Sequence, residues 1–171
     1  MARSEEEYRA LFESDPMHLD AFASLRRIFR QEERHEDLAW LFETRASHMD
    51  KGSKAAELYM RAADVRIQKM DDEEKGIEDL LAAMRSDPGQ RRVVKKLKGR
   101  LKEAARWEEY LEVLQNELQS LSSVPGRERR ISALHLEMGT LLEEHFSKVD
   151  KAMYHYQIGR ASCRERVCHR V

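Results

Sequence analysis

Hydrophobic residues recur along the chain at intervals of three and four, the spacing of one face of an α-helix. In DAFASLRRIFRQEERHEDLAWLFETRA, Phe22, Leu25 and Phe29 share one face, and Leu41 and Phe42 resume the pattern after a polar break. This is the pattern of two amphipathic helices joined by a turn. Applied to the whole chain, it predicts helices over residues 3–14, 17–32, 35–49, 53–70, 73–86, 90–104, 107–121, 127–146 and 149–157.

The sequence repeats itself internally. The tripeptide Ser-Asp-Pro occurs at 14–16 and again at 86–88, which gives an offset of 88 − 16 = 72 along the chain. At this offset core-type positions coincide while surface positions do not, as expected if packing alone sets the pattern. The coinciding pairs include Leu25 with Leu97, Phe29 with Leu101, Leu41 with Val113 and Phe42 with Leu114.

The segments between these pairs match at a slightly larger offset of 76, which places Val65 on Leu141 and Ile77 on Met153. The extra length falls in SLSSVPGRE, a loop-forming stretch rich in serine, proline and glycine. The chain is therefore built from a structural unit whose length is the offset of 72 residues, and this unit occurs nearly twice.

Each Ser-Asp-Pro tripeptide precedes a predicted helix. Pro16 and Pro88 would stand in the first turn, where the missing N–H costs nothing, and Asp15 and Asp87 are predicted to cap the helices that follow.

Helix pairs of this length, closed by a proline, resemble the tetratricopeptide repeat. The resemblance is clearest in LYMRAADVRIQKMDDEEKGIEDLLAAMRSDP. Counting back from Pro88, Ile67 takes the large site of the first helix, Leu80 the large site of the second and Ala83 the small site, while Gly76 replaces the usual alanine. The resemblance implies an all-α, right-handed α-α superhelix of helix hairpins.

The chain departs from the family pattern at one site. The small residue expected in each first helix is replaced by Arg26, Asp64 and Lys98.

The resemblance also divides the chain. Residues 1–16 would end a preceding repeat, residues 17–157 would form about four helix pairs with the last truncated, and residues 158–171 would be a non-native or disordered tail. We expect the sequence to be a fragment of a longer array.

The expected tail, IGRASCRERVCHRV, carries both cysteines of the chain, Cys163 and Cys168, beside His169. A zinc site would need further paired ligands that this spacing lacks. The stretch IGRASCRERV resembles the in-frame translation of a sequencing-library adapter, and Gly159 is predicted to break the last helix. We interpret the tail as read-through rather than as a metal site.

Composition agrees with a helical, non-membrane chain. Charged residues make up 37% and apolar residues 41%, with three prolines, and no apolar run approaches the roughly 20 residues that span a bilayer. No signal peptide is evident, so we expect a cytoplasmic protein. The net charge is −1, and residues 158–171 hold four arginines and one glutamate, so residues 1–157 carry −1 − 3 = −4.

The main charged feature is QRRVVKKLKGRLKEAAR, with eight basic residues and one acidic residue. It is either a patch for phosphate or an acidic peptide, or a solvated helix face neutralised by nearby acids. Nucleic acid is not expected, because no aromatic residues interleave with these cations.

In tetratricopeptide arrays the first helices line the groove that takes peptides. The resemblance therefore implies groove positions at Asp20, Ala23, Arg27 and Arg30 in one repeat and at Arg92, Lys95, Gly99 and Lys102 in another. We predict that Arg27, Arg30, Arg92, Lys95 and Lys102 line one basic face that binds a partner, with apolar contacts from Ala23 and Val94.

No catalytic constellation is evident in the sequence, and no cofactor or metal is predicted. The six histidines before the tail are expected at the surface, and Trp40, Trp107, Tyr154 and Tyr156 in packing contacts. The predicted function is a non-enzymatic scaffold for another protein. The alternatives are a helical regulatory segment of a larger signalling enzyme or, with less support, an RNA-binding helical repeat.

Overall fold

The computed structural model describes residues 4–164, and it describes side chains as far as residue 160. The described residues contain helices and turns but no strand, so the predicted all-α fold class is confirmed. The helices are α1 (Glu5–Ser14), α2 (Leu19–Gln31), α3 (His35–Ser47), α4 (Ser53–Val65), the π-helical turn η1 (Arg66–Met70), α5 (Glu73–Ser86), α6 (Arg91–Glu103), α7 (Trp107–Ser122), α8 (Glu128–Glu144) and α9 (Val149–Arg164).

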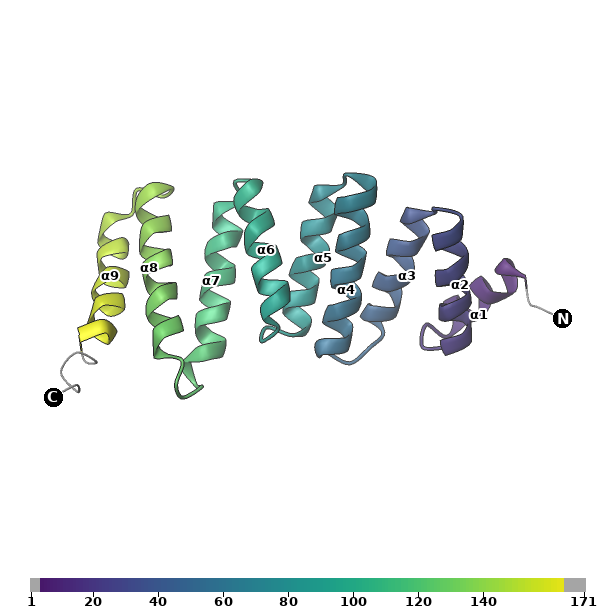
Figure 1. The fold of residues 1–171 in the computed structure, drawn as a ribbon, viewed down its shortest axis with the longest axis horizontal. Coiled ribbons are helices and arrows are strands. Elements are labelled where there is room, and N and C mark those ends of the chain that lie inside the picture. The colour runs from purple at the N-terminus through teal and green to yellow at the C-terminus, as the bar shows by residue number, and fades with distance from the viewer. Residues whose placement is uncertain (1–3, 165–171) are drawn as a thin grey trace. The chain divides into compact units, whose positions relative to one another are not determined.

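The chain forms two compact units, Met1–Leu97 and Lys98–Val171. In the first unit, consecutive helices from α1 to α5 pack side by side as antiparallel hairpins (Figure 1). There α2 and α4 form one layer and α3 and α5 the other. In the second unit, α7 packs against α8 and α8 against α9.

The two Ser-Asp-Pro turns adopt the same structure. Asp15 ends α1, and its carboxylate accepts the N–H of Met17 at 2.9 Å. Asp87 ends α5 in the same way, and its carboxylate accepts the N–H of Gly89 at 3.1 Å. The two aspartates therefore shape the turn, and the prediction that they cap the following helices is wrong. In α2 that role belongs to His18.

The hairpin turns repeat at the offsets found in the sequence. Glu33 and Ala105 both adopt the left-handed conformation, with φ of 55° and 53°, and their numbers differ by 105 − 33 = 72. Asp71 and Ser147, with φ of 55° and 52°, differ by 147 − 71 = 76. A left-handed residue ends a helix because it turns the next N–H back toward the last free carbonyls. The internal repeat is thus a repeat of structure.

The predicted core is confirmed. The buried residues lie at helical intervals on facing helices, and the six positions expected from the periodicity are at most 1% exposed. In the first unit, aromatic rings fill the space between hairpins, with Phe22 in contact with Phe12 and Phe42 at centroid distances of 6.2 and 6.1 Å. The six positions are Leu25, Phe29, Phe42, Leu80, Leu97 and Leu114.

A π-helical turn ends the first helix of the second hairpin. It widens the backbone over Arg66–Met70, and Ile67 then packs directly on Gly76 of α5. A Cβ atom at Gly76 would lie 2.4 Å from Cγ1 of Ile67, so no larger residue fits without movement. Glycine at the usual alanine position is therefore required by the close approach of η1 and α5.

The predicted end of the last helix is wrong. α9 runs through Gly159 to Arg164 rather than stopping at residue 157. Gly159 is buried, and a Cβ atom there would lie 2.9 Å from Cγ of Leu136 on α8. The glycine therefore allows two helices to approach closely instead of breaking one. Cys168 and His169, from the rejected metal hypothesis, lie outside the described residues.

Candidate functional site

Arg27 and Arg30 project from the outer face of α2. Both side chains are exposed, and the buried face of α2 is formed by Phe22, Leu25 and Phe29. At 100° per residue, Arg27 lies almost opposite the middle of that buried face. The packing of α2 thus fixes which of its arginines face solvent.

Arg92, Lys95 and Lys102 project from α6 by the same rule. All three are exposed, and they lie opposite the buried Leu97 and Leu101. Arg92 and Lys95 belong to the unit Met1–Leu97 and Lys102 belongs to the other unit. That all five predicted residues form one continuous face stays a prediction.

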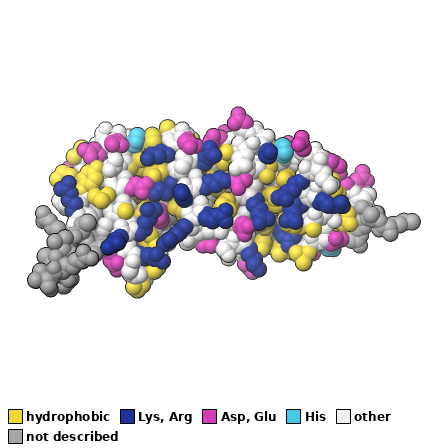
Figure 2. Space-filling model, viewed as in Figure 1, with side chains coloured by type: hydrophobic (Ala, Val, Ile, Leu, Met, Phe, Trp, Pro, Cys, Tyr) yellow, Lys and Arg dark blue, Asp and Glu magenta, His cyan; other side chains and the backbone are white. Residues whose placement is uncertain are grey.

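No ion pair or hydrogen bond of the five cations is made within residues 4–160. Other arginines of the chain are engaged: Arg34 contacts Glu5 at 2.6 Å and Asp37 at 2.8 Å, and Arg106 contacts Glu109 at 2.7 Å. Arg92, Lys95 and Lys102 therefore form no ion pair with an acidic residue of the described part of the chain. Figure 2 shows Lys and Arg side chains gathered on the face presented by α2 and α4.

Of the two residues predicted to make apolar contacts with a partner, one is exposed and the other is buried in the core. Ala23 is exposed on α2, as predicted. Val94 is only 5% exposed and belongs to the core, so its prediction as a contact residue is wrong. The apolar side chains that are exposed near α2 are instead Met17 and Leu19, at 41% and 74%.

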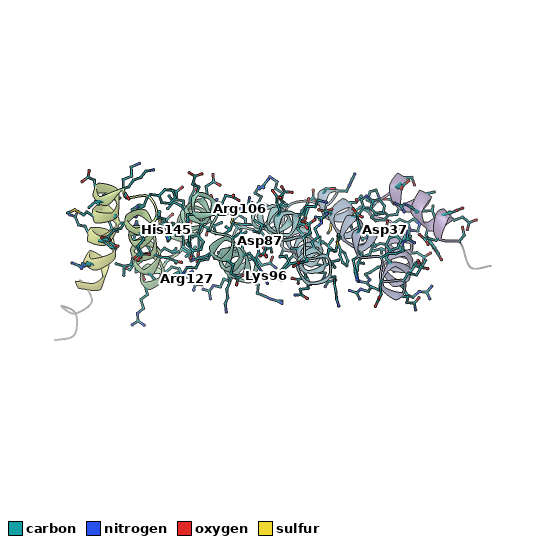
Figure 3. The ribbon with its side chains drawn as sticks, turned by 90° about the horizontal axis from the view of Figure 1, so that it is seen from above. Asp37, Asp87, Lys96, Arg106, Arg127 and His145 are labelled. Atoms are coloured by element: carbon teal, nitrogen blue, oxygen red, sulfur yellow. The ribbon has the colours of Figure 1, made fainter. Side chains whose placement is uncertain are left out.

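The three charged residues at the small-residue site differ in their partners. Asp64 forms an ion pair with Lys96 of α6, which Figure 3 labels. Lys98 contacts Glu137 of α8 at 2.8 Å. Arg26 has no carboxylate partner in the described part of the chain and lies over the ring of Phe22, with its Cζ atom 5.6 Å from the centroid.

The Lys98 contact is part of a polar cluster in the second unit. Glu137 also accepts a hydrogen bond from the hydroxyl of Tyr110. Burial alone would raise the pKa of Glu137, but the charge of Lys98 and these hydrogen bonds lower it. Burial and the adjacent Glu137 carboxylate raise the pKa of Tyr110. These contacts join α6, α7 and α8 through Lys98, Tyr110 and Glu137.

A buried ion cluster joins α3, η1 and α5, and sequence reasoning missed it. Nη2 of Arg66 lies 2.8 Å from Oε2 of Glu43, and its Nη1 lies 2.7 Å from Oδ2 of Asp79. Burial, together with a hydrogen bond to Glu43, raises the pKa of Asp79 to about 8. Asp79 therefore keeps its proton at neutral pH. The π-helical turn, which begins at Arg66, was not predictable from periodicity.

Two histidines meet inside the second unit, contrary to the prediction that all histidines are at the surface. His135 is 8% exposed, and its Nδ1 lies 2.9 Å from Nδ1 of His155. Burial lowers the pKa of both imidazoles, and the charge of His135 further lowers that of His155. The sequence alone does not show that these two residues, which lie on different helices, are in contact.

The aromatic predictions are confirmed except at one position. Trp40 packs edge-on against Phe12 at 5.6 Å, and Trp107 stacks on His145 at 3.8 Å. Tyr156 packs on Gly139. Tyr154 is 61% exposed, so its prediction as a packing residue is wrong.

No group of three or more His, Cys, Asp or Glu residues that could hold a metal ion occurs among the residues that the structure describes. The helices over these residues also include none with the length and apolar character needed to cross a bilayer.

Antiparallel helix hairpins that recur at fixed offsets with the same turns make this an all-α helical repeat protein, the fold that the resemblance to the tetratricopeptide repeat implies. No protein-family model matches the chain, and no curated protein sequence matches it.

Three solved structures are similar over most of the chain. One described as "Crystal structure of MamA" has a TM-score of 0.47 and 13% identity over 96% of this chain and 90% of that one. "Crystal structure of MamA protein" has a TM-score of 0.49 and 13% identity over 98% and 85%. BtubC (BKLC) from P. vanneervenii has a TM-score of 0.46 and 19% identity over 95% and 70%.

Proposed function

We propose that this chain is a non-enzymatic protein-interaction scaffold that binds an acidic segment of a partner protein. The binding face is the outer surface of the first helices of its hairpins, and it includes Arg27, Arg30, Arg92, Lys95 and Lys102. The observation that carries the proposal is that these cations are exposed and have no carboxylate partner within residues 4–160. Cations kept solvated in this way are available to an incoming anionic chain.

The energetics favour an extended contact over a single site. Each exposed ion pair contributes only about 0–1 kcal/mol, so several must form together to give useful affinity. Helices fixed by a buried core present their charges without rearrangement, which lowers the entropic cost of binding. The association should weaken as salt rises, because exposed charges are screened.

The proposal is tested with a short fluorescent poly-glutamate peptide. The double variant Arg92→Glu with Lys95→Glu should bind this probe about tenfold more weakly at low salt, since two attractive contacts become repulsive. The control carries Arg85→Glu with Lys151→Glu, which gives the same net charge from two exposed cations on the second helices α5 and α9 rather than on the first helices that form the proposed face. Circular dichroism checks that both variants stay helical.

Equal loss of binding in both double variants would show that only net charge matters, and the proposed face would be wrong. A tighter, salt-sensitive complex with RNA homopolymers than with poly-glutamate would favour the nucleic-acid alternative instead.

A further inference from the structure

Two arginines converge on one aromatic ring in the first unit. The Cζ atom of Arg45, on α3, lies 4.3 Å from the centroid of the Phe22 ring. The Cζ atom of Arg26, one turn after Phe22 on α2, lies 5.6 Å from the same centroid. Two like charges beside one ring repel each other, and no carboxylate of the described chain forms an ion pair with either of them.

Of the two arginines, Arg45 has the charge whose burial is less well offset by other contacts. The residue is only 7% exposed, and the one hydrogen bond that it makes within residues 4–160 is a long contact of 3.5 Å to the carbonyl of Pro16. Burial lowers the pKa of its guanidinium, with the charge of Asp15 acting in the opposite direction. A buried guanidinium with a single weak acceptor destabilises the free protein unless another anion completes its hydrogen bonds.

The equivalent positions of the internal repeat show which partner the two arginines lack. At the offset of 72, Arg26 corresponds to Lys98 (26 + 72) and Arg45 corresponds to Glu117 (45 + 72). In the second unit these two positions form a cation–carboxylate pair, with Nζ of Lys98 3.8 Å from Oε2 of Glu117. The first unit has a cation at both positions, so the carboxylate of the equivalent pair is absent.

Apolar side chains are exposed beside the two arginines. Leu19, Phe22 and Arg26 stand at i, i+3 and i+7 on α2, and residues with this spacing lie along one ridge of a helix. Leu19 is 74% exposed, and Met17 in the preceding turn is 41% exposed. Figure 2 shows hydrophobic and basic side chains next to one another at this end of the chain.

We propose that Arg26, Arg45 and Phe22 form a subsite for one acidic side chain of a partner peptide, with Leu19 covering an apolar side chain next to it. The carboxylate pairs with Arg26 as Glu117 pairs with Lys98 in the second unit. The inference rests on the proposed function, because it assigns an anchoring point to the partner segment. It differs in its residues, none of which belongs to the five cations predicted from the sequence.

The test uses two small probes, acetyl-Leu-Glu-amide and its neutral counterpart acetyl-Leu-Gln-amide. The side-chain Nε–Hε signals of Arg26 and Arg45 are followed by nuclear magnetic resonance during titration to about 10 mM, where even a millimolar complex is mostly formed. The glutamate probe should shift both signals, and the glutamine probe should bind at least about tenfold more weakly, because hydrogen bonds to charged groups are stronger than neutral ones.

The variant Arg45→Glu installs the carboxylate that the second unit already has. It should raise the thermal midpoint of the free protein by about 2–4 °C and abolish the response to the glutamate probe. Lys51→Glu, an exposed site with the same change of charge, should do neither. Arg45→Met provides a second variant, since it removes the charge and keeps the side-chain volume, and it should leave the midpoint equal or higher.

A lower midpoint for Arg45→Met would show that the guanidinium stabilises the free protein, and the subsite would be excluded. Equal responses to both probes, or no response at the end of the titration, would also overturn it. Neither result depends on Arg92 and Lys95. The poly-glutamate experiment and the titration with the two small probes can therefore succeed or fail independently of each other.

Discussion

Nδ1 of His135 on α8 lies 2.9 Å from Nδ1 of His155 on α9, a hydrogen bond that needs one imidazole to donate and the other to accept. The accepting ring must therefore be neutral, and the contact is lost when both rings are protonated. This pair couples the packing of the last two helices to pH.

We predict that the free energy of unfolding falls as pH is lowered below about 6.5. The pKa of both imidazoles is lowered in the folded chain, mainly by burial, whereas the unfolded chain takes up protons near 6.5. The stabilisation is thus fully present above pH 6.5 and is lost as pH falls toward the folded pKa values, by at most about 1.4 kcal/mol per pH unit for each proton. Urea unfolding at pH 7.5 and pH 5.5 measures it.

His135→Gln should reduce this pH dependence, because one of the two buried imidazoles is gone. His48→Gln, at an exposed site just after the end of α3, is the control and should keep it. An unchanged slope in His135→Gln would mean that the histidine pair is not the acid-sensitive contact.

We predict that Asp79→Asn stabilises the chain at alkaline pH. Asp79 keeps its proton to a pKa of about 8 when folded, owing to burial and its hydrogen bond with Glu43, but releases it near 4 when unfolded. Its contribution to stability is therefore present below pH 4 and is lost as pH rises through about 8. Asparagine can replace the protonated acid as a neutral donor, so the free energy of unfolding at pH 8.5 should rise by about 1–3 kcal/mol.

Glu78→Gln, on the exposed side of the same helix, is the matched control for Asp79→Asn. Its effect on stability should be within about 0.5 kcal/mol. A destabilised Asp79→Asn at pH 8.5 would show that Arg66 requires two ionised carboxylates.

Two glycine-to-alanine changes should act in opposite directions. Gly76→Ala places a Cβ atom 2.4 Å from Ile67, and overpacking of this kind costs about 1–3 kcal/mol, more than the gain in helix propensity. Gly99→Ala meets no atom within 4 Å on exposed α6 and should stabilise the chain by about 0.5–1 kcal/mol. Thermal unfolding by circular dichroism compares them. Two shifts of the same sign would contradict the close approach of η1 to α5.

Leu114→Ala should lower the free energy of unfolding by about 2–5 kcal/mol, the usual cost of a cavity at a fully buried leucine. Val124→Ala, in the exposed loop before α8, should change it by no more than about 0.5 kcal/mol. Urea unfolding of the two variants measures the difference. Similar small effects in both would mean that Leu114 is not enclosed by its neighbours.

The sequence by itself determined the helices and their repetition. The interval of three and four between apolar residues depends only on the geometry of the α-helix, so Leu25, Phe29 and Leu114 could be assigned to the core before any packing was known. The offset between the two Ser-Asp-Pro tripeptides was also readable, and the left-handed residues Glu33 and Ala105 reproduce it in the backbone.

Only the tertiary structure decided which charges have partners. The sequence marks Arg26, Lys98 and Asp64 as unusual, but it cannot show that Lys98 meets Glu137 while Arg26 meets no carboxylate of the described chain. Such contacts join residues that are distant along the chain, and they depend on how neighbouring helices are rotated and how closely they approach. For the same reason, the sequence did not predict the contact of Arg66 with Asp79 or that of His135 with His155. It also did not predict that Gly159 is a packing site rather than a helix end.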